Sequence, residues 1–229
     1  MDRRMDKRAA AAYGRRVKGQ GSHMRAWAYI LGLGTLLAGA GMAVTSFGGP
    51  AGAQPRAALP AAPPASEVPP RSAFDIRLTR IDGRPLPLDQ FRGKVLLVVN
   101  TASKCGFTPQ YDGLVKLQET YAARGFTVIG IPSGDFLGQE FASNAEIAKF
   151  CETRFGVNFP MTERMHVTGP KANLFHRWAR ANLAENAVPQ WNFHKILVGR
   201  DGRAIAGFGS RVEPTSAELT RAIERALAS

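Results

Sequence analysis

One cysteine lies in a polar segment that is suited to hold a reactive sulfur at the edge of a sheet. The segment is NTASKCGFTPQY (100–111), and its cysteine is Cys105. It follows an apolar, β-branched run and precedes a stretch with helical spacing, which we expect Thr108 to cap and Pro109 to begin. The positive end of a helix favours the thiolate, the reactive form of cysteine, and Lys104 adds positive charge. The alternative is a buried structural cysteine, which the polar, glycine-containing turn disfavours.

The second cysteine of the chain, Cys151, is expected on the inner face of a helix. The spacing of Ile147, Phe150, Cys151 and Phe155 predicts one apolar stripe. Two interpretations of Cys151 remain open from the residues alone. It is either a packed core side chain or a partner for Cys105 in a disulfide, which would require the helix to unwind because disulfide geometry is strict.

Three other thiol or metal chemistries fit the sequence poorly. A thioredoxin-like disulfide reductase needs two cysteines spaced Cys-x-x-Cys, but here Thr108 takes the second position. A peroxiredoxin needs Thr-x-x-Cys, and Thr101 lies four residues before Cys105. An exported metal-binding module needs close imidazole or thiolate ligands, and the histidines form no such cluster with the cysteines: His23, His166, His176 and His194.

Three segments, in the same order, resemble the glutathione peroxidase family. NTASKCGFTPQY is similar to the family's active-site segment in the form that uses cysteine instead of selenocysteine. FLGQEFASNAEI (136–147) resembles FGxQEPGSxxEI, and PQWNFHKILVGRDG (189–202) resembles WNFxKFLV. The resemblance covers about residues 74–229. It implies a thioredoxin-like α/β fold, with a central mixed sheet flanked by helices, and a peroxidase that needs no bound cofactor.

The resemblance also implies a catalytic set. Cys105 would attack the peroxide, and Gln139, Trp191 and Asn192 match the family's glutamine and Trp-Asn pair. Their amide and indole N–H groups are able to donate to the sulfur and to the leaving oxygen. Taken alone, Trp191 would be a core aromatic, and Gln139 and Asn192 would be loop or turn residues; only their combination with Cys105 favours catalysis.

Oxidation of Cys105 by peroxide would give a sulfenic acid that a thiol must reduce. The resemblance implies thioredoxin, a thioredoxin-like protein or glutathione as that co-substrate. Many thioredoxin-dependent members carry Phe-x-Cys-Thr-Arg-Phe, whereas Cys151 stands one place earlier in this chain. Whether Cys151 resolves the sulfenic acid or stays inert, which would leave the task to an external thiol, therefore remains open.

Two further departures from the family pattern bear on the site and its substrate. Asp135 stands near the glutamine motif, and a carboxylate directed at the sulfur would oppose the thiolate. The link from Leu183 to Trp191 is short, which resembles the monomeric members that accept lipid hydroperoxides. We therefore expect a monomer that reduces hydrogen peroxide and organic or lipid hydroperoxides.

The segments between these motifs predict alternating strands and helices. Strands are expected at 95–102 and 126–132 and in a hairpin of 194–199 and 203–209, because these runs are apolar or β-branched. Residues 74–83 predict a short amphipathic strand that runs into a turn at Asp82-Gly83. Helices are expected at 109–123, 146–155, 173–182 and 215–228. This order matches the thioredoxin-like arrangement.

The first part of the chain is typical of an export signal. Residues 1–53 combine a basic stretch, an apolar run from Ala26 to about Phe47 and a small-x-small ending at Ala51–Ala53. They hold eight basic and two acidic residues, half of the net charge of +12, so the remainder gives no reason to expect a nucleic-acid partner. Cleavage and membrane anchoring both remain open, as does a start at Met1 or Met24. Residues 54–71 form a Pro- and Ala-rich linker, and we expect a periplasmic domain at 72–229.

Overall fold

The computed structural model describes residues 69–229. The predicted export segment, 1–53, and nearly all of the predicted linker, 54–71, lie outside the described residues. Within the described part, no helix is both long and apolar enough to cross a membrane.

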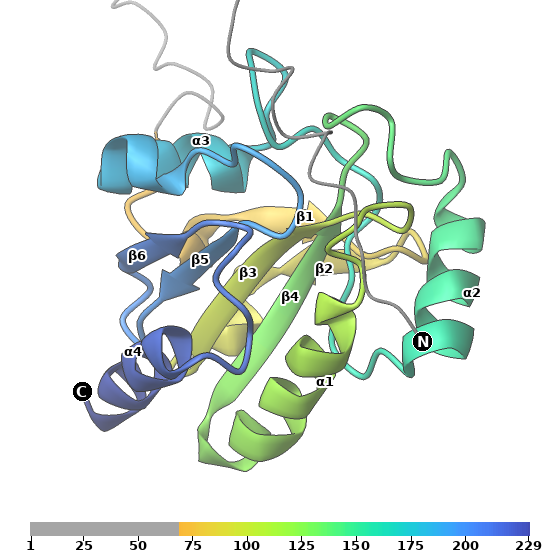
Figure 1. Cartoon of the computed structure of the whole chain (residues 1–229). Coiled ribbons are helices and arrows are strands. Elements are labelled where there is room, and N and C mark those ends of the chain that lie inside the picture. The colour runs from red at the N-terminus through yellow and green to blue at the C-terminus, as the bar shows by residue number, and fades with distance from the viewer. Residues whose placement is uncertain (1–68) are drawn as a thin grey trace, which may run out of the picture. The chain divides into compact units, whose positions relative to one another are not determined.

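A four-stranded mixed sheet forms the centre of the domain, in the order β4-β3-β5-β6 (Figure 1). β3 and β4 pair in parallel, whereas β5 is antiparallel to both β3 and β6. The strands are β3 (Val95–Thr101), β4 (Phe126–Pro132), β5 (Lys195–Val198) and β6 (Ala204–Phe208). β3 and β4 are buried along their whole length, as expected for continuous apolar runs in a sheet covered on both faces.

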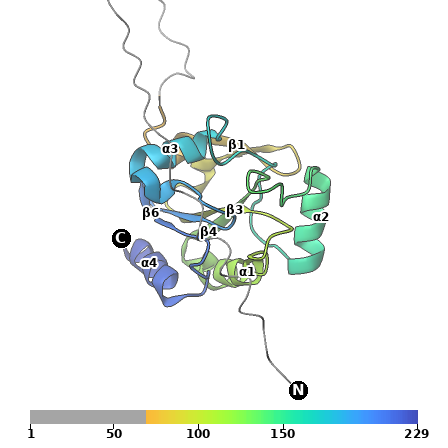
Figure 2. The same ribbon diagram turned by 45° about the horizontal axis from the view of Figure 1, so that its top comes forward.

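Helices cover both faces of this sheet (Figures 1 and 2). One core contains Val95, Leu97 and Val99 of β3 with side chains of α1, α2 and α4. The other core contains Leu96 and Val98 with side chains of α3 and of a small ribbon made by β1 and β2. The elements are α1 (Gln110–Tyr121), α2 (Asn144–Phe155), α3 (Leu174–Leu183), α4 (Ala217–Ala228), β1 (Arg77–Thr79) and β2 (Pro85–Pro87). Alternate residues of β3 thus supply both cores, because side chains alternate along a strand.

The predicted helices and the strands of the central sheet are confirmed, with small differences at their ends. The strand predicted within 74–83 begins later than expected and is shorter, because Ala73–Asp75 form a 3-10 turn and β1 contains only three residues. The turn predicted at Asp82-Gly83 is confirmed. Ser72 and Asp75 cap that turn with a reciprocal pair of hydrogen bonds. Local side-chain capping therefore overrides the alternating pattern at the start of this segment.

Candidate active site

The Cys105 turn follows the buried strand β3 and leads into α1. Thr108 fixes this turn, because its Oγ1 accepts a hydrogen bond from the Cys105 N–H at 3.0 Å and donates to the Ala102 carbonyl at 2.9 Å. The prediction that Thr108 caps α1 is therefore wrong: the hydroxyl is engaged inside the turn, and Pro109 stands at the N-cap without a side-chain hydrogen bond. The Phe107 N–H points back to the sulfur, 3.4 Å from Cys105 Sγ.

Gln139 and Asn192 come from distant segments and meet beside this turn. Asn192 Nδ2 donates to Gln139 Oε1 at 2.9 Å, and the Gln139 carbonyl accepts from the Lys104 N–H at 2.8 Å. Because Gln139 Oε1 is occupied, its Nε2 group is the end left to donate. Asn192 is fully buried, and its Oδ1 has no hydrogen-bond partner in the described part of the chain.

Trp191 is attached to the same end of β3. Its carbonyl accepts from Asn100 Nδ2 at 3.1 Å, and its ring centroid lies 5.6 Å from that of Phe136. Trp191 is partly exposed, and with Phe107 it lines an open depression of about 390 Å³. The other lining residues are Gln190, Ser210 and Arg211.

The four predicted catalytic residues are thus gathered around one edge of the sheet. Among the described residues, the hydrogen bond from Phe107 reaches Cys105 Sγ, and none joins the sulfur to the side chains of Gln139, Trp191 or Asn192. Cys105 has a relative exposure of 8%. The arrangement places the amides of Gln139 and Asn192 beside the turn that holds the buried Cys105 thiol.

The sequence left open whether the Asp135 carboxylate opposes the Cys105 thiolate, but in the structure this carboxylate is bonded to another loop. Its carboxylate accepts from the Val167 and Thr168 N–H groups at 2.7 and 3.1 Å, and His166 Nδ1 lies 2.6 Å away. Burial alone would raise the pKa of Asp135, but these hydrogen bonds outweigh it and lower the pKa below its ordinary value. Asp135 therefore fastens the 166–168 loop.

Cys151 lies on the inner face of α2, only 2% exposed, and its Sγ lies 3.4 Å from the hydroxyl of Tyr111. Burial raises the pKa of the Cys151 thiol to about 11, despite the hydrogen bond with Tyr111. Both cysteines are free in the structure. Cys151 is thus a buried, protonated thiol in this conformation.

Sequence reasoning missed two buried polar residues next to the site, Glu140 and Lys195. Lys195 Nζ donates to Gln110 Oε1 and to the Val212 carbonyl, both at 2.6 Å, and burial lowers its pKa to about 8. It ties the first residue of α1 to the loop that carries Ser210. A lysine at a fully buried strand position is the signal that would have revealed it, because such a residue needs partners.

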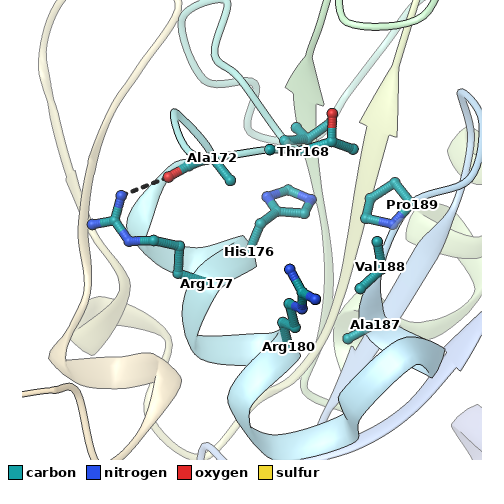
Figure 3. Close-up of a pocket in the computed structure, with 10 residues that line it drawn as sticks. Thr168, Ala172, His176, Arg177, Arg180, Ala187, Val188 and Pro189 are labelled. Carbon is teal, nitrogen blue, oxygen red and sulfur yellow. Dashed lines mark hydrogen bonds between the residues drawn. The ribbon is translucent and has the colours of Figure 1, made fainter. Parts of the chain in front are cut away.

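A smaller pocket of about 50 Å³ lies against α3 and is lined in part by the 167–169 segment that Asp135 holds (Figure 3). The ring of His176 points into it, and burial lowers the pKa of this histidine to about 3. Arg177 is turned aside and donates to the Ala172 carbonyl at 2.6 Å. In residues 69–229, no group of three or more histidine, cysteine or acidic side chains is placed to hold a metal ion.

The fold itself defines the broad class of the protein, which is thioredoxin-like. A thioredoxin-family thiol:disulfide interchange protein from Chlorobium tepidum superposes with a TM-score of 0.50 over 70% of this chain and 99% of its own, at 20% identity. The crystal structure of Trgpx in its apo form superposes with a TM-score of 0.56 over 69% of this chain and 96% of its own, at 31% identity.

The sequence comparisons narrow that class to one family. The glutathione peroxidase family model matches residues 73–180, which include Cys105 and Gln139. The hydroperoxy fatty acid reductase gpx1 of Synechocystis is 44% identical over 155 residues, which are 64% of this chain and 90% of that protein. The chain belongs to the glutathione peroxidase family, and it is a thiol-dependent peroxidase.

Proposed function

We propose that Cys105 is the residue that reduces the peroxide. Its thiolate attacks one oxygen of a hydroperoxide ROOH, an S–O bond forms as the O–O bond breaks, and the leaving RO⁻ takes up a proton to give the alcohol. Cys105 is left as a sulfenic acid. The observation that carries this proposal is the Asn192–Gln139–Lys104 chain of hydrogen bonds, which fixes an amide donor beside the Cys105 turn.

The roles proposed for the neighbouring side chains follow from where charge develops. Gln139 Nε2 and the indole N–H of Trp191 are proposed to donate to the sulfur or to the departing oxygen. Asn192 orients Gln139 from a buried position. Fixed neutral donors stabilise a developing oxyanion without reorganising during the step.

Organic hydroperoxides are the proposed preferred substrates, with hydrogen peroxide as a smaller one. The depression formed by Phe107 and Trp191 is open and mostly apolar, and Arg211 also lines it. This suits a chain that carries an acidic head group, in keeping with a relative named a hydroperoxy fatty acid reductase. We propose that the protein acts as a monomer.

An external thiol is the proposed reductant, either a thioredoxin-like protein or glutathione. Two equivalents are needed, because the first thiol forms a mixed disulfide with Cys105 and releases water, and the second frees Cys105 as the external disulfide leaves. The buried, protonated state of Cys151 favours this route over an internal disulfide.

A peroxide-consumption assay on the full chain tests these assignments. Wild type, Cys105→Ser and Cys151→Ser are compared with a fatty acid hydroperoxide and with hydrogen peroxide, each with thioredoxin or glutathione. We expect turnover to vanish in Cys105→Ser and to persist in Cys151→Ser. Turnover that survives Cys105→Ser would refute the assignment, and turnover lost in Cys151→Ser would make that residue the resolving thiol.

We also propose that the protein is exported, with its domain in the periplasm or anchored outside the cytoplasm. The support is the basic, apolar and small-x-small order of residues 1–53. Fractionation of cells that express the chain, followed by N-terminal sequencing, separates cleavage from anchoring. Recovery of the intact chain in the cytoplasm would contradict export.

A further inference from the structure

Glu140 is a buried carboxyl group that follows Gln139 directly. It is 4% exposed, and no lysine or arginine forms an ion pair with it among residues 69–229. Its Oε1 accepts two backbone hydrogen bonds, from Ser103 at 3.2 Å and from Phe141 at 2.7 Å. Burying a carboxyl group without a cationic partner costs free energy, so the position of Glu140 calls for a structural or functional reason.

These bonds join the Cys105 turn to the Gln139 segment at two adjacent points. Ser103 donates to the Glu140 side chain, and Lys104 donates to the Gln139 carbonyl. The Lys104 Nζ also lies 4.2 Å from the centroid of the Phe141 ring. The position of the Gln139 amide relative to Cys105 therefore depends on the oxygen that Glu140 offers to Ser103.

The second oxygen of Glu140 indicates the protonation state. Oε2 is buried without a hydrogen-bond partner in the described part of the protein, and so is Ser103 Oγ. A proton on Oε2 removes the charge that would otherwise be left unpaired. Burial raises the pKa of Glu140 above its ordinary value, although the nearby Ser103 side chain and the N–H groups of Phe141 and Ser103 act to lower it.

Two ionisable groups beside Glu140 are neutral, and a third, Arg164, favours the charged form but is exposed. Tyr111 of α1 and Cys151 of α2 both sense its charge, and burial raises the pKa of each, so both are neutral. Arg164 acts on it electrostatically, but Glu140 forms no ion pair with that exposed side chain. A second negative charge near Cys105 would moreover oppose the thiolate.

We propose that Glu140 is a positioning residue for the peroxidase reaction, which holds Gln139 against the Cys105 turn as a neutral, protonated carboxyl group. The inference rests on the proposed role of Cys105. Leu137, which lies in the same loop as Gln139, is exposed. The buried side chain of Glu140, the residue after Gln139, explains how this loop keeps the glutamine in place.

Two substitutions of similar size separate the acceptor from the charge. Glu140→Gln keeps Oε1 as an acceptor and carries no charge, so we expect its kcat/KM for peroxide to stay within about threefold of wild type. Glu140→Met fills the same space without an acceptor, so we expect kcat/KM to fall about 10- to 100-fold. Glu119→Met, at an exposed position of α1, is the matched control and should change neither value.

Alkylation of Cys105 by iodoacetamide distinguishes a specific effect on catalysis from a general loss of structure, because a loss of structure would also change the alkylation rate. Alkylation needs the thiolate but no donor to a departing oxygen. Glu140→Met is therefore expected to be destabilised by the unpaired Ser103 and Phe141 N–H groups, but to lose much less of its alkylation rate than of its peroxidase activity. The infrared difference spectrum of wild type against Glu140→Gln should show the carbonyl band of a protonated carboxyl.

Three results would overturn the proposal: full activity in Glu140→Met, equal losses in both Glu140 variants, or carboxylate bands in the difference spectrum. If Glu140→Met does not fold, the Glu140→Gln activity and the infrared band still decide. Failure of the underlying function is recognised separately, because Cys105→Ser would then retain turnover.

Discussion

The two cysteines of this protein are both shielded from solvent, yet their surroundings favour opposite chemistry. Cys105 lies in a turn where a backbone N–H points at its sulfur and amide side chains stand nearby. Cys151 lies among apolar side chains of α2 and α1, with the Tyr111 hydroxyl as its polar contact. Exposed fractions of 8% and 2% do not separate them. What separates them is the supply of hydrogen-bond donors, because donors stabilise a thiolate and hydrocarbon does not.

The sharpest test of this difference is selective alkylation. Since burial raises the pKa of Cys151 to about 11, only about one molecule in 10,000 carries its thiolate at pH 7. We expect iodoacetamide to modify Cys105 at least about 100-fold faster than Cys151 in the folded protein, as measured by peptide mass spectrometry. The two rates should become similar in urea; equal rates in the native state would show that the contrast is wrong.

A substitution of Asn192 tests whether the hydrogen-bond donors around Cys105 contribute to the reaction with peroxide as well as to ionisation of the thiol. Asn192→Ala removes the partner of Gln139 Oε1, so the amide loses its fixed direction. We expect kcat for peroxide to fall about 100-fold, with a much smaller loss in the rate of Cys105 alkylation. Asn182→Ala, at an exposed position of α3, serves as control. A parallel loss of both reactions in Asn192→Ala would mean that Asn192 supports the turn and not the chemistry.

Thr108 tests how strongly the Cys105 turn is fixed. Thr108→Val removes an acceptor from the Cys105 N–H and a donor from the Ala102 carbonyl, both inside the protein. We expect a loss of about 1–3 kcal/mol in the free energy of unfolding by urea. Thr120→Val, whose hydroxyl donates to Lys116 on an exposed face, should cost less than about 0.5 kcal/mol. Similar costs at the two sites would show that the turn is not specially held.

The smallest expected effect concerns Cys151 and alkaline pH. Its pKa is raised from 9.0 to about 11 in the folded state, so the unfolded chain releases this proton first and stability falls as pH rises between these values. The stability difference between wild type and Cys151→Ala should shrink by about 1 kcal/mol between pH 9 and pH 10. Taking the difference cancels Lys195, which titrates in the same range with the opposite sign. A difference independent of pH would place Cys151 in contact with solvent.

The parts of this molecule that the sequence predicts well are those with a regular pattern. Continuous apolar runs identify β3 and β4, and the Cys105, Gln139 and Trp191–Asn192 motifs identify the residues that gather at one edge of the sheet. The pairing of β1 with β2 escaped prediction, since both strands are three residues long and β2 begins and ends with proline. The role of Thr108 was not predicted, because its hydroxyl is able either to cap α1 or to bond within the Cys105 turn, and the tertiary geometry decides between the two.

The direction of a side chain was the other limit. Asp135 looked capable of opposing the thiolate, and only its bonds to the 166–168 loop show that it is engaged elsewhere. Glu140 also carries a carboxyl group and lies five residues later, but it turns inward. No periodic pattern distinguishes two acids in an irregular loop, since their orientation depends on which backbone N–H groups are close.

The antiparallel pairing of β5 with β3 has a consequence for how the protein matures. β3 is built early in the chain, whereas its neighbour and the Trp191–Asn192 pair lie near the end, joined to β3 through Asn100. While β5 has not yet been synthesised, the nascent chain already contains the complete Cys105 segment. At that stage the Gln139 side chain lacks Asn192, and β3 lacks the strand that pairs with it on one side. The proposed catalytic sulfur is thus synthesised well before the groups proposed to direct it, so any protection against oxidation during synthesis must come from outside the chain.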